Sequence, residues 1–231
     1  MTTGRDSLMR AVCLLSGSGT NLQAILDNIS AKKIKLTMTS VISDNPIAMG
    51  LERARSSGIK TGVIDYKSYA KKSDYHGALK EYVANENPDL IILAGYMRIL
   101  SDDFCNTFKG SILNIHPSLL PKYKGLNTHQ RVINEGETYH GSSVHFVIPE
   151  LDEGPCIIQY RLKISPTDDA ESLKNRVQKG EYIIYSEAIR HFISGTIKME
   201  NDKIIYKGGH LVKPILIEAV SYTHLTLPTK A

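Results

Sequence analysis

Residues 9–29, MRAVCLLSGSGTNLQAILDNI, join a short apolar run to an amphipathic stretch through a turn that contains two glycines. The apolar run lacks regular polar alternation, which is typical of a strand buried on both faces. Similar apolar runs follow at 36–43, 60–65, 88–96 and 111–116, each separated from the next by a longer segment of helical character. Strands that alternate with helices in this way predict an α/β fold with a doubly wound, mostly parallel sheet.

The pattern changes after residue 139. Residues 140–164 contain two β-rich pieces joined by an acidic corner, and residues 168–193 have a helical pattern with an N-terminal signal at Asp168 or Asp169. We therefore expect antiparallel C-terminal strands on the same sheet, then one long helix. A hairpin at 195–208 is expected to close a single domain over residues 1–210. The tail, 211–231, ends in a dozen residues that fit neither period and are expected to be flexible or non-native.

Composition and charge exclude several classes of protein. Of the 231 residues, 42% are hydrophobic and 23% charged, and the formal net charge of +4 arises from basic residues that are spread along the chain. This distribution argues against a nucleic-acid partner and suits small anionic substrates. Cys13, Cys105 and Cys156 form no C-x-x-C pair, which is typical of a reduced protein. Because the apolar run before Ser16 is too short for a signal peptide or a membrane span, we expect a cytoplasmic protein.

The glycine turn is a candidate phosphate site. Gly17 and Gly19 lie between the first strand and the first helix, and Thr20 or Asn21 could cap that helix. Backbone N–H groups at a helix N-terminus favour an anion. A dinucleotide fingerprint needs a small residue where Leu22 stands, and no Gly-Lys-Ser/Thr run is present, so a monophosphate fits better than NAD or ATP. Taken alone, the motif is equally consistent with a simple strand-to-helix turn.

Polar residues suited to acyl-type transfer occur further along. Asn114 and His116 are two residues apart at the end of a predicted strand, so both side chains should face one surface. The acidic corner supplies Glu150, Asp152 and Glu153. An amide, an imidazole and a carboxylate can stabilise a tetrahedral oxyanion and move a proton without a protein nucleophile.

Other uses of the polar residues fit less well. His140 and His145 are five residues apart on a predicted strand and should face opposite sides. Neither an H-E-x-x-H metal motif nor a G-x-S-x-G elbow is present, and we expect no bound metal. For each histidine alone, a hydrogen-bonded structural role is the alternative.

Asp44, in SDNP, could bind a ribose but is better explained as a turn residue. A further alternative, a non-catalytic nucleotide-binding module, would have no use for Asn114, His116 and Asp152 together.

Six segments carry a family resemblance: SGSGTNLQAI, ERARSSGI, PDLIILAGYMRILS, LNIHPSLLPKYKG, HGSSVHFV and LDEGP. In order and spacing they resemble the formyltetrahydrofolate-dependent formyltransferases, and among them the phosphoribosylglycinamide (glycinamide ribonucleotide) formyltransferases, over about Met9 to Gly208. The resemblance implies a Rossmann-like formyltransferase fold. It also implies transfer of a formyl group from the co-substrate 10-formyltetrahydrofolate to the amine of glycinamide ribonucleotide, in purine biosynthesis. The close alternatives, a formyltetrahydrofolate hydrolase and a methionyl-tRNA formyltransferase, usually carry a further domain for which the expected fold leaves no room.

The resemblance also assigns roles to single residues. Asn114, His116 and Asp152 match the catalytic trio, in which the amide and a protonated imidazole hold the oxyanion while the carboxylate pairs with the imidazole and assists proton transfer. Lys72 stands where relatives often have an arginine that reaches the substrate phosphate. The implied glycinamide ribonucleotide site is Gly19, Thr20, Asn21, Lys72, Gln178 and Glu181; the implied folate site is Met97, Arg98, Ile99, Leu100, Asn114 and Asp152; and Ser143 and His145 match positions behind the catalytic residues. Both substrates are small molecules, and we expect a monomer or a homodimer.

Overall fold

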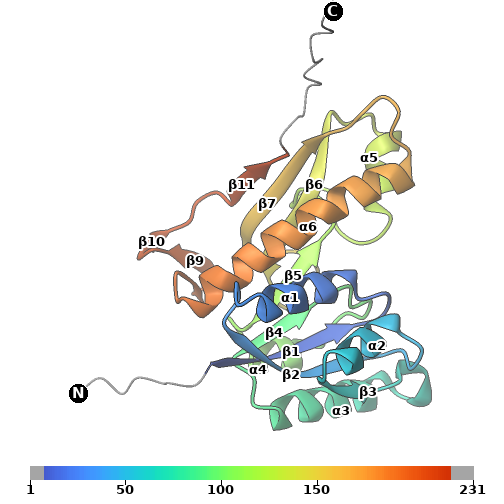
Figure 1. Ribbon diagram of the computed structural model, residues 1–231, viewed down its shortest axis with the longest axis vertical. Helices are drawn as coiled ribbons and strands as arrows, with labels where there is room; N and C mark the ends of the chain where they lie inside the picture. The colour runs from blue at the N-terminus through green and yellow to red at the C-terminus, as the bar shows by residue number, and fades with distance from the viewer. Residues whose placement is uncertain (1–7, 220–231) are drawn as a thin grey trace, which may run out of the picture.

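The computed structural model describes residues 8–219. Its centre is an eight-stranded sheet in the order β11-β7-β6-β5-β4-β1-β2-β3 (Figure 1). The strands are β1 (Met9–Leu15), β2 (Leu36–Ser43), β3 (Lys60–Val63), β4 (Leu90–Leu93), β5 (Ile112–His116), β6 (Tyr139–Phe146), β7 (Cys156–Lys163) and β11 (Ile215–Glu218). A separate three-stranded antiparallel sheet contains β8 (Ile197–Glu200), β9 (Lys203–Tyr206) and β10 (Gly209–His210).

The pairing within the large sheet confirms the predicted fold class. Strands β1 to β5 are parallel to one another, whereas β6 is antiparallel to both β5 and β7. The chain runs outward from β1 to β2 and β3 and then crosses to β4 on the other side of β1. In sheets of this kind, ligands bind beyond the carboxyl ends of the strands where the order reverses, which here lies between β1 and β4.

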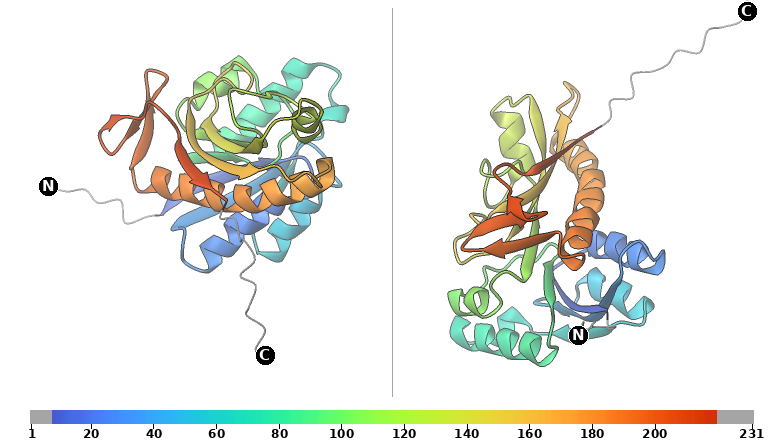
Figure 2. Two further views of the ribbon diagram at one scale, coloured as in Figure 1. Left: turned by 90° about the horizontal axis from the view of Figure 1, so that it is seen from above. Right: turned by 90° about the vertical axis from the view of Figure 1, so that its left-hand side faces the viewer.

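Helices cover both faces of the sheet (Figure 2). On one face lie α1, α2 and α6, and on the other lie the short helix η1 together with α3 and α4. Their bounds are α1 (Thr20–Ser30), α2 (Met49–Ser56), η1 (Tyr66–Ser68), α3 (Lys72–Asn85), α4 (Asp102–Thr107), α5 (Thr128–Asn134) and α6 (Ala170–Ile193).

Strand β1 shows why its sequence is apolar throughout. Ala11 and Cys13 belong to the core cluster beneath α1, α2 and α6, whereas Val12 and Leu14 belong to the cluster beneath α3 and α4. All four side chains are completely buried. Because successive side chains of a strand point to opposite faces, a strand covered on both sides needs apolar residues at every position.

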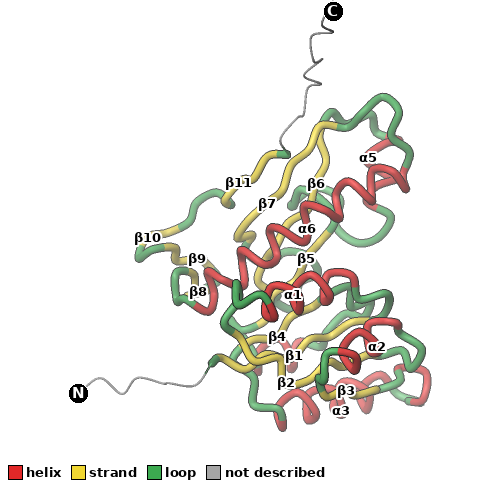
Figure 3. Tube along the Cα trace, in the orientation of Figure 1, coloured by secondary structure: helices red, strands yellow, loops and turns green. Residues whose placement is uncertain are grey.

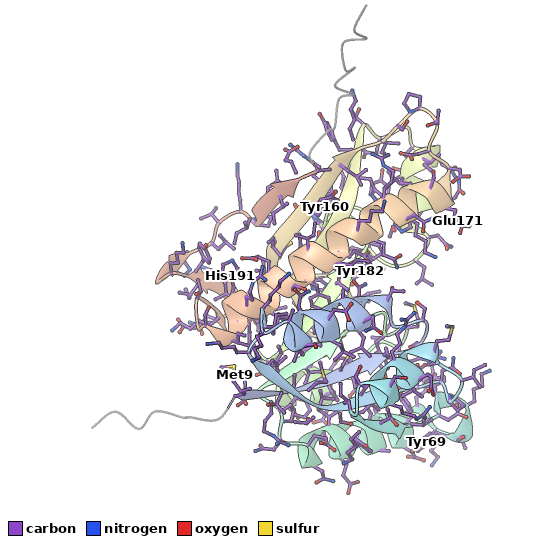
Figure 4. All side chains as sticks on the ribbon, in the orientation of Figure 1. Met9, Tyr69, Tyr160, Glu171, Tyr182 and His191 are labelled. Atoms are coloured by element: carbon purple, nitrogen blue, oxygen red, sulfur yellow. The ribbon has the colours of Figure 1, made fainter. Side chains whose placement is uncertain are left out.

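The long helix α6 begins as the sequence predicts. The Asp169 side chain accepts a hydrogen bond from the backbone N–H of Ser172, and the Ser172 hydroxyl accepts one from the backbone N–H of Asp169, which makes a capping box. Figure 4 labels Glu171, Tyr182 and His191, which mark the course of α6 along the sheet. No helix between residues 8 and 219 has the length and apolar character needed to cross a membrane.

Helix α5 and strand β11 were not predicted (Figure 3). Helix α5 is only seven residues long and follows a long loop after β5. Strand β11 lies beyond residue 210, where the domain was expected to end, and pairs in parallel with β7. That boundary is therefore wrong for Ile215–Glu218, because Ile215 and Ile217 pack on the main core. The dozen residues 220–231 lie outside the described residues.

Candidate active site

A cavity of about 610 Å³ opens beyond the carboxyl ends of β4 and β5. It brings together segments that are far apart in the sequence: the loop after β4, the end of β5, the start of α5 and the acidic corner between β6 and β7. The lining residues are Leu93, 95–100, Cys105, 114–117, 125–129, His145, 147–152 and Lys174. Predicted catalytic residues and the predicted folate segment therefore share one cavity.

Asn114 and His116 are two residues apart on β5, and their cross-strand partners on β6 are His145 and Ser143. Both side chains therefore face the same side of the sheet, as their spacing predicts. The loop after β6 returns Asp152 to this face. Its Oδ2 atom lies 3.4 Å from Nδ1 of His116, and both side chains are 7% exposed. The amide, imidazole and carboxylate that the sequence placed in two distant motifs thus lie together at the wall of the cavity.

The hydrogen bonds of His116 determine which ring nitrogen is free. Its Nε2 atom lies 2.9 Å from the backbone carbonyl oxygen of Tyr123. A carbonyl can only accept, so Nε2 carries a proton. The other nitrogen, Nδ1, faces Asp152, and a proton on Nδ1 would lie between the imidazole and the carboxylate.

His145 fixes the amide of Asn114. Nδ1 of His145 is 2.8 Å from the carbonyl oxygen of Phe146, so this nitrogen is the donor, and Nε2 accepts a hydrogen bond from Nδ2 of Asn114 at 3.1 Å. Burial lowers the pKa of His145 to about 4, which keeps the ring neutral near pH 7. One hydrogen of the Asn114 amide is used in this contact, and the other remains for a substrate oxygen.

The carboxylate of Asp152 lies between the loop before α5 and the side chains of His116 and His145. This residue has φ +54°, in the left-handed region where Asp is tolerated better than most residues. The backbone N–H of Gly125 donates to Oδ2 at 2.9 Å, and Nε2 of His145 lies 3.8 Å from Oδ1. Asp152 therefore connects the loop before α5 to the two histidines.

Ser143 holds the loop after β5 and does not itself line the cavity. Its hydroxyl donates to the Ser118 carbonyl oxygen at 2.7 Å and accepts from the Leu120 N–H at 3.0 Å. Nε2 of Gln159 donates to the Leu120 carbonyl oxygen and to the Ser143 hydroxyl. All of these contacts fix the segment that leads from His116 to Tyr123.

A second histidine pair was not predicted. His129 on α5 and His140 on β6 share a hydrogen bond of 2.9 Å between Nδ1 and Nε2. Burial lowers the pKa of His129 to about 4 and that of His140 to about 3. His140 faces away from His145, as the spacing along β6 predicts. Its hydrogen bond with His129 is consistent with a structural role, which was the alternative expected for each histidine taken alone.

The glycine loop is held by close backbone packing. Gly19 has φ +70°, and a Cβ atom at this position would lie 2.5 Å from Cα of Gly50. The N–H of Gly50 donates to the Gly17 carbonyl oxygen at 3.0 Å, and Nε of Arg53 donates to the Ser18 carbonyl oxygen at 2.8 Å. The start of α2 therefore presses directly on the loop. Only glycine fits this contact and this backbone conformation together.

The side chains that follow the loop reach α6 and do not cap α1. Gly19 is the N-cap, so the expectation that Thr20 or Asn21 caps the helix is wrong. Oγ1 of Thr20 accepts from Nε2 of Gln178 at 2.9 Å, and Nδ2 of Asn21 donates to Oε2 of Glu181 at 2.8 Å. Within residues 8–219, no side chain caps α1, so the backbone donors of its first turn keep no side-chain partner.

Glu181 is buried beside this helix terminus. Burial raises its pKa, while the hydrogen bond from Asn21 and the charge of Lys174 act in the opposite direction. Oδ1 of Asn21 is buried and has no hydrogen-bond partner within residues 8–219. An acceptor pair, the Asn21 oxygen and the Glu181 carboxylate, is thus available to the donors of a ligand.

Two lysines differ in their relation to the site. Lys72 begins α3 and is exposed, and within residues 8–219 no hydrogen bond or ion pair joins it to the glycine loop. Lys174, which was not predicted, lines the cavity and shares one face of α6 with Gln178 and Glu181, since these positions are i, i+4 and i+7. The helical spacing from Glu181 was the signal that could have identified Lys174.

The predicted folate segment has exposed apolar side chains at the cavity. Met97 and Ile99 are 61% and 62% exposed, and both line the cavity together with Arg98 and Leu100. Asp44, the alternative ribose ligand, is buried and forms an ion pair with Arg98. Within residues 8–219, no three His, Cys, Asp or Glu side chains are arranged to hold a metal ion.

Comparison with known proteins gives a consistent result. Residues 9–189 match the family model described as "Formyl transferase". The chain is 42% identical to phosphoribosylglycinamide formyltransferase of Escherichia coli, over 88% of this chain and 96% of that protein. Two solved structures are similar. The phosphoribosylglycinamide formyltransferase of Coxiella burnetii has a TM-score of 0.87 and 42% identity, with 91% and 99% of the two chains covered. Glycinamide ribonucleotide transformylase 1 of Symbiobacterium toebii has a TM-score of 0.84 and 38% identity, with 89% and 99% covered.

Proposed function

Because the chain belongs to the formyl transferase family, with phosphoribosylglycinamide formyltransferases as relatives over most of its length, we propose how its own residues carry out formyl transfer. The protein is a formyltransferase of purine biosynthesis. Its formyl donor is 10-formyltetrahydrofolate and its acceptor is the amine of glycinamide ribonucleotide. The products are formylglycinamide ribonucleotide and tetrahydrofolate. A cytoplasmic location and a monomeric or homodimeric state stay predictions.

The reaction needs no covalent intermediate with the protein. The amine attacks the formyl carbon, a C–N bond forms, and the carbonyl oxygen becomes an oxyanion. The bond between that carbon and N10 of the folate then breaks, the attacking nitrogen loses a proton, and N10 gains one. The protein must stabilise the oxyanion and move this proton.

Asn114, His116 and Asp152 supply these two functions. The free amide hydrogen of Asn114 donates to the oxyanion, and the positive charge of protonated His116, whose Nδ1 faces Asp152, stabilises it. Asp152, which lies 3.4 Å from that nitrogen, then accepts the proton of the attacking amine and returns one to N10 through water. The observation that carries this proposal is the convergence of the three groups in the cavity that the 97–100 segment also lines.

The ribonucleotide extends from this point toward α1. Backbone N–H groups of Gly19, Thr20 and Asn21 bind the phosphate at the helix N-terminus. Glu181 accepts hydrogen bonds from the glycinamide ribonucleotide. Gln178 acts through Thr20, because its amide is already bonded to that hydroxyl. The backbone of 97–100 binds the pterin, and Lys72 reaches the phosphate from outside.

The test is formyl transfer by the purified protein. 10-Formyltetrahydrofolate is mixed with glycinamide ribonucleotide, and the release of tetrahydrofolate is followed spectroscopically, with a matched reaction that lacks the ribonucleotide. Release that requires the ribonucleotide is expected. Release at the same rate in both reactions would indicate a hydrolase and contradict the assignment of the acceptor.

A further inference from the structure

Asp44 is a buried carboxylate that lies outside the cavity. It follows β2 directly, and its side chain is 1% exposed. Its Oδ2 atom accepts a hydrogen bond from Nε of Arg98 at 2.6 Å, whereas Oδ1 has no hydrogen-bond partner within residues 8–219. Burying a carboxylate is unfavourable unless its charge is compensated. Arg98 is therefore the group on which the stability of the Asp44 charge depends.

Arg98 is held on a second side by an aromatic ring. The guanidinium carbon lies 4.1 Å from the ring centroid of Tyr66, in a cation–π arrangement. The Tyr66 N–H donates to the Asp44 carbonyl oxygen at 3.2 Å, so ring and carboxylate are parts of one local structure. The Arg98 side chain is nevertheless 36% exposed and lines the cavity. A residue at the cavity surface is thus anchored to a buried charge behind it.

The backbone around Arg98 has few other anchors. Residues 97–100 form neither strand nor helix, so no regular hydrogen-bond ladder fixes them. The N–H of Met97 donates to Oγ of Ser16 at 2.8 Å, and Nδ2 of Asn45 donates to the Ser16 carbonyl oxygen at 3.2 Å. Leu100 packs in the core beneath α3 and α4, and the two polar anchors of the segment, at Met97 and at Arg98, lead to the carboxyl ends of β1 and β2.

We propose that Asp44 is a positioning residue for the folate: through its ion pair with Arg98 it holds the 97–100 backbone in the conformation that receives the pterin. This inference rests on the proposed function of the 97–100 segment. It predicts an effect on folate binding that is separate from ribonucleotide binding, since the glycine loop has its own contacts with Gly50 and Arg53.

The first test is Asp44→Asn, which keeps the shape of the side chain and removes its charge. The dissociation constant for tetrahydrofolate, measured by equilibrium titration without ribonucleotide, is expected to rise about tenfold. The KM for 10-formyltetrahydrofolate should rise by a similar factor, while the KM for glycinamide ribonucleotide changes less than about twofold. An unchanged tetrahydrofolate dissociation constant would overturn the proposal, as would equal increases in both KM values.

The matched control is Asp202→Asn. Asp202 pairs with Lys109 at 2.9 Å on the exposed surface, and its left-handed backbone conformation suits Asn. This variant should leave the tetrahydrofolate dissociation constant unchanged. Thermal denaturation of both variants separates a local effect from a general loss of stability. If Asp44→Asn does not fold, Asp44→Glu, which retains the charge, provides the same titration with a smaller expected increase.

A double-mutant cycle tests whether Asp44 acts through Arg98. Asp44→Asn, Arg98→Met and the double variant should weaken tetrahydrofolate binding by nearly the same factor, because each removes the same ion pair. Additive losses would overturn the proposal. Wild-type protein that binds tetrahydrofolate but transfers no formyl group would contradict the proposed function alone, whereas wild-type protein that does not bind tetrahydrofolate would contradict both.

Discussion

The two ends of the site are constructed differently. At the catalytic end, side chains are oriented by other groups from distant segments: Asn114 by His145, and His116 by the Tyr123 carbonyl and by Asp152. At the proposed phosphate end, the proposed binding groups are backbone N–H donors of the glycine loop, whose position depends on the contact of Gly19 with Gly50. The difference indicates that substitutions at the first end should lower turnover, whereas those at the second should weaken binding.

The largest effect is expected at the catalytic end. His116→Ala and Asp152→Ala should each lower kcat by about 10²–10⁴-fold, because they remove groups that act mainly in the transition state. The dissociation constant for glycinamide ribonucleotide, measured by calorimetry, should change little. His210→Ala, at an exposed histidine, is the matched control. Wild-type kcat in either catalytic variant would contradict the mechanism.

A glycine substitution tests the phosphate end. Gly19→Ala forces a Cβ atom to within 2.5 Å of Cα of Gly50 at φ +70°, so the loop must shift. We expect KM for glycinamide ribonucleotide to rise about tenfold or more and the protein to lose about 1–3 kcal/mol of stability.

Gly17→Ala is the control for that experiment, since a Cβ there has no neighbour within 4 Å. Steady-state kinetics and urea unfolding of the two variants check both expectations. Equal effects at both positions would show that the contact between Gly19 and Gly50 does not determine the geometry of the loop.

Acid should destabilise the folded protein through three buried histidines. His129, His140 and His145 have pKa values lowered by burial to about 4, 3 and 4, below the ordinary value near 6.5. The unfolded chain therefore binds more protons than the folded protein between these values. The stabilising contribution is present above pH 6.5 and is lost as the pH falls toward the folded-state values, by about 2 kcal/mol for each histidine between pH 7 and pH 5.

Urea unfolding of the wild type at pH 7 and pH 5 measures this slope. His140→Gln should reduce the pH dependence, whereas His210→Gln, at an exposed position, should not. A pH dependence that is identical in the wild type and His140→Gln would contradict the assignment.

The smallest effect is expected from the lysines. Lys174→Ala should raise KM for glycinamide ribonucleotide about three- to tenfold, because its charge faces the cavity and Glu181. Lys72→Ala should raise the same KM by less, because Lys72 is exposed and is not bonded to the glycine loop. Lys179→Ala on α6 is the control. A larger effect of Lys72→Ala than of Lys174→Ala would show that the lysine assigned by the family resemblance, and not the lysine that lines the cavity, binds the phosphate.

Most of the fold could be predicted because its signals are local. Apolar runs without alternation identify strands buried on both faces, as Val12 and Cys13 illustrate by belonging to opposite clusters. The sequence also predicted the N-terminal cap of α6, because the capping box joins Asp169 to Ser172, only three residues away. Helix α5 and strand β11 are short, and their stability comes from packing against α6 and β7, which a local pattern does not reveal.

The sequence by itself determined that Asn114 and His116 share a face, because strand periodicity follows from backbone geometry alone. Only the tertiary structure decided what meets that face. The approach of Asp152 to His116, the bond between His145 and Asn114, and the ion pair of Asp44 with Arg98 each join residues that are 31 or more positions apart. Such contacts depend on the order of strands in the sheet and on where each loop turns, and no local pattern encodes them.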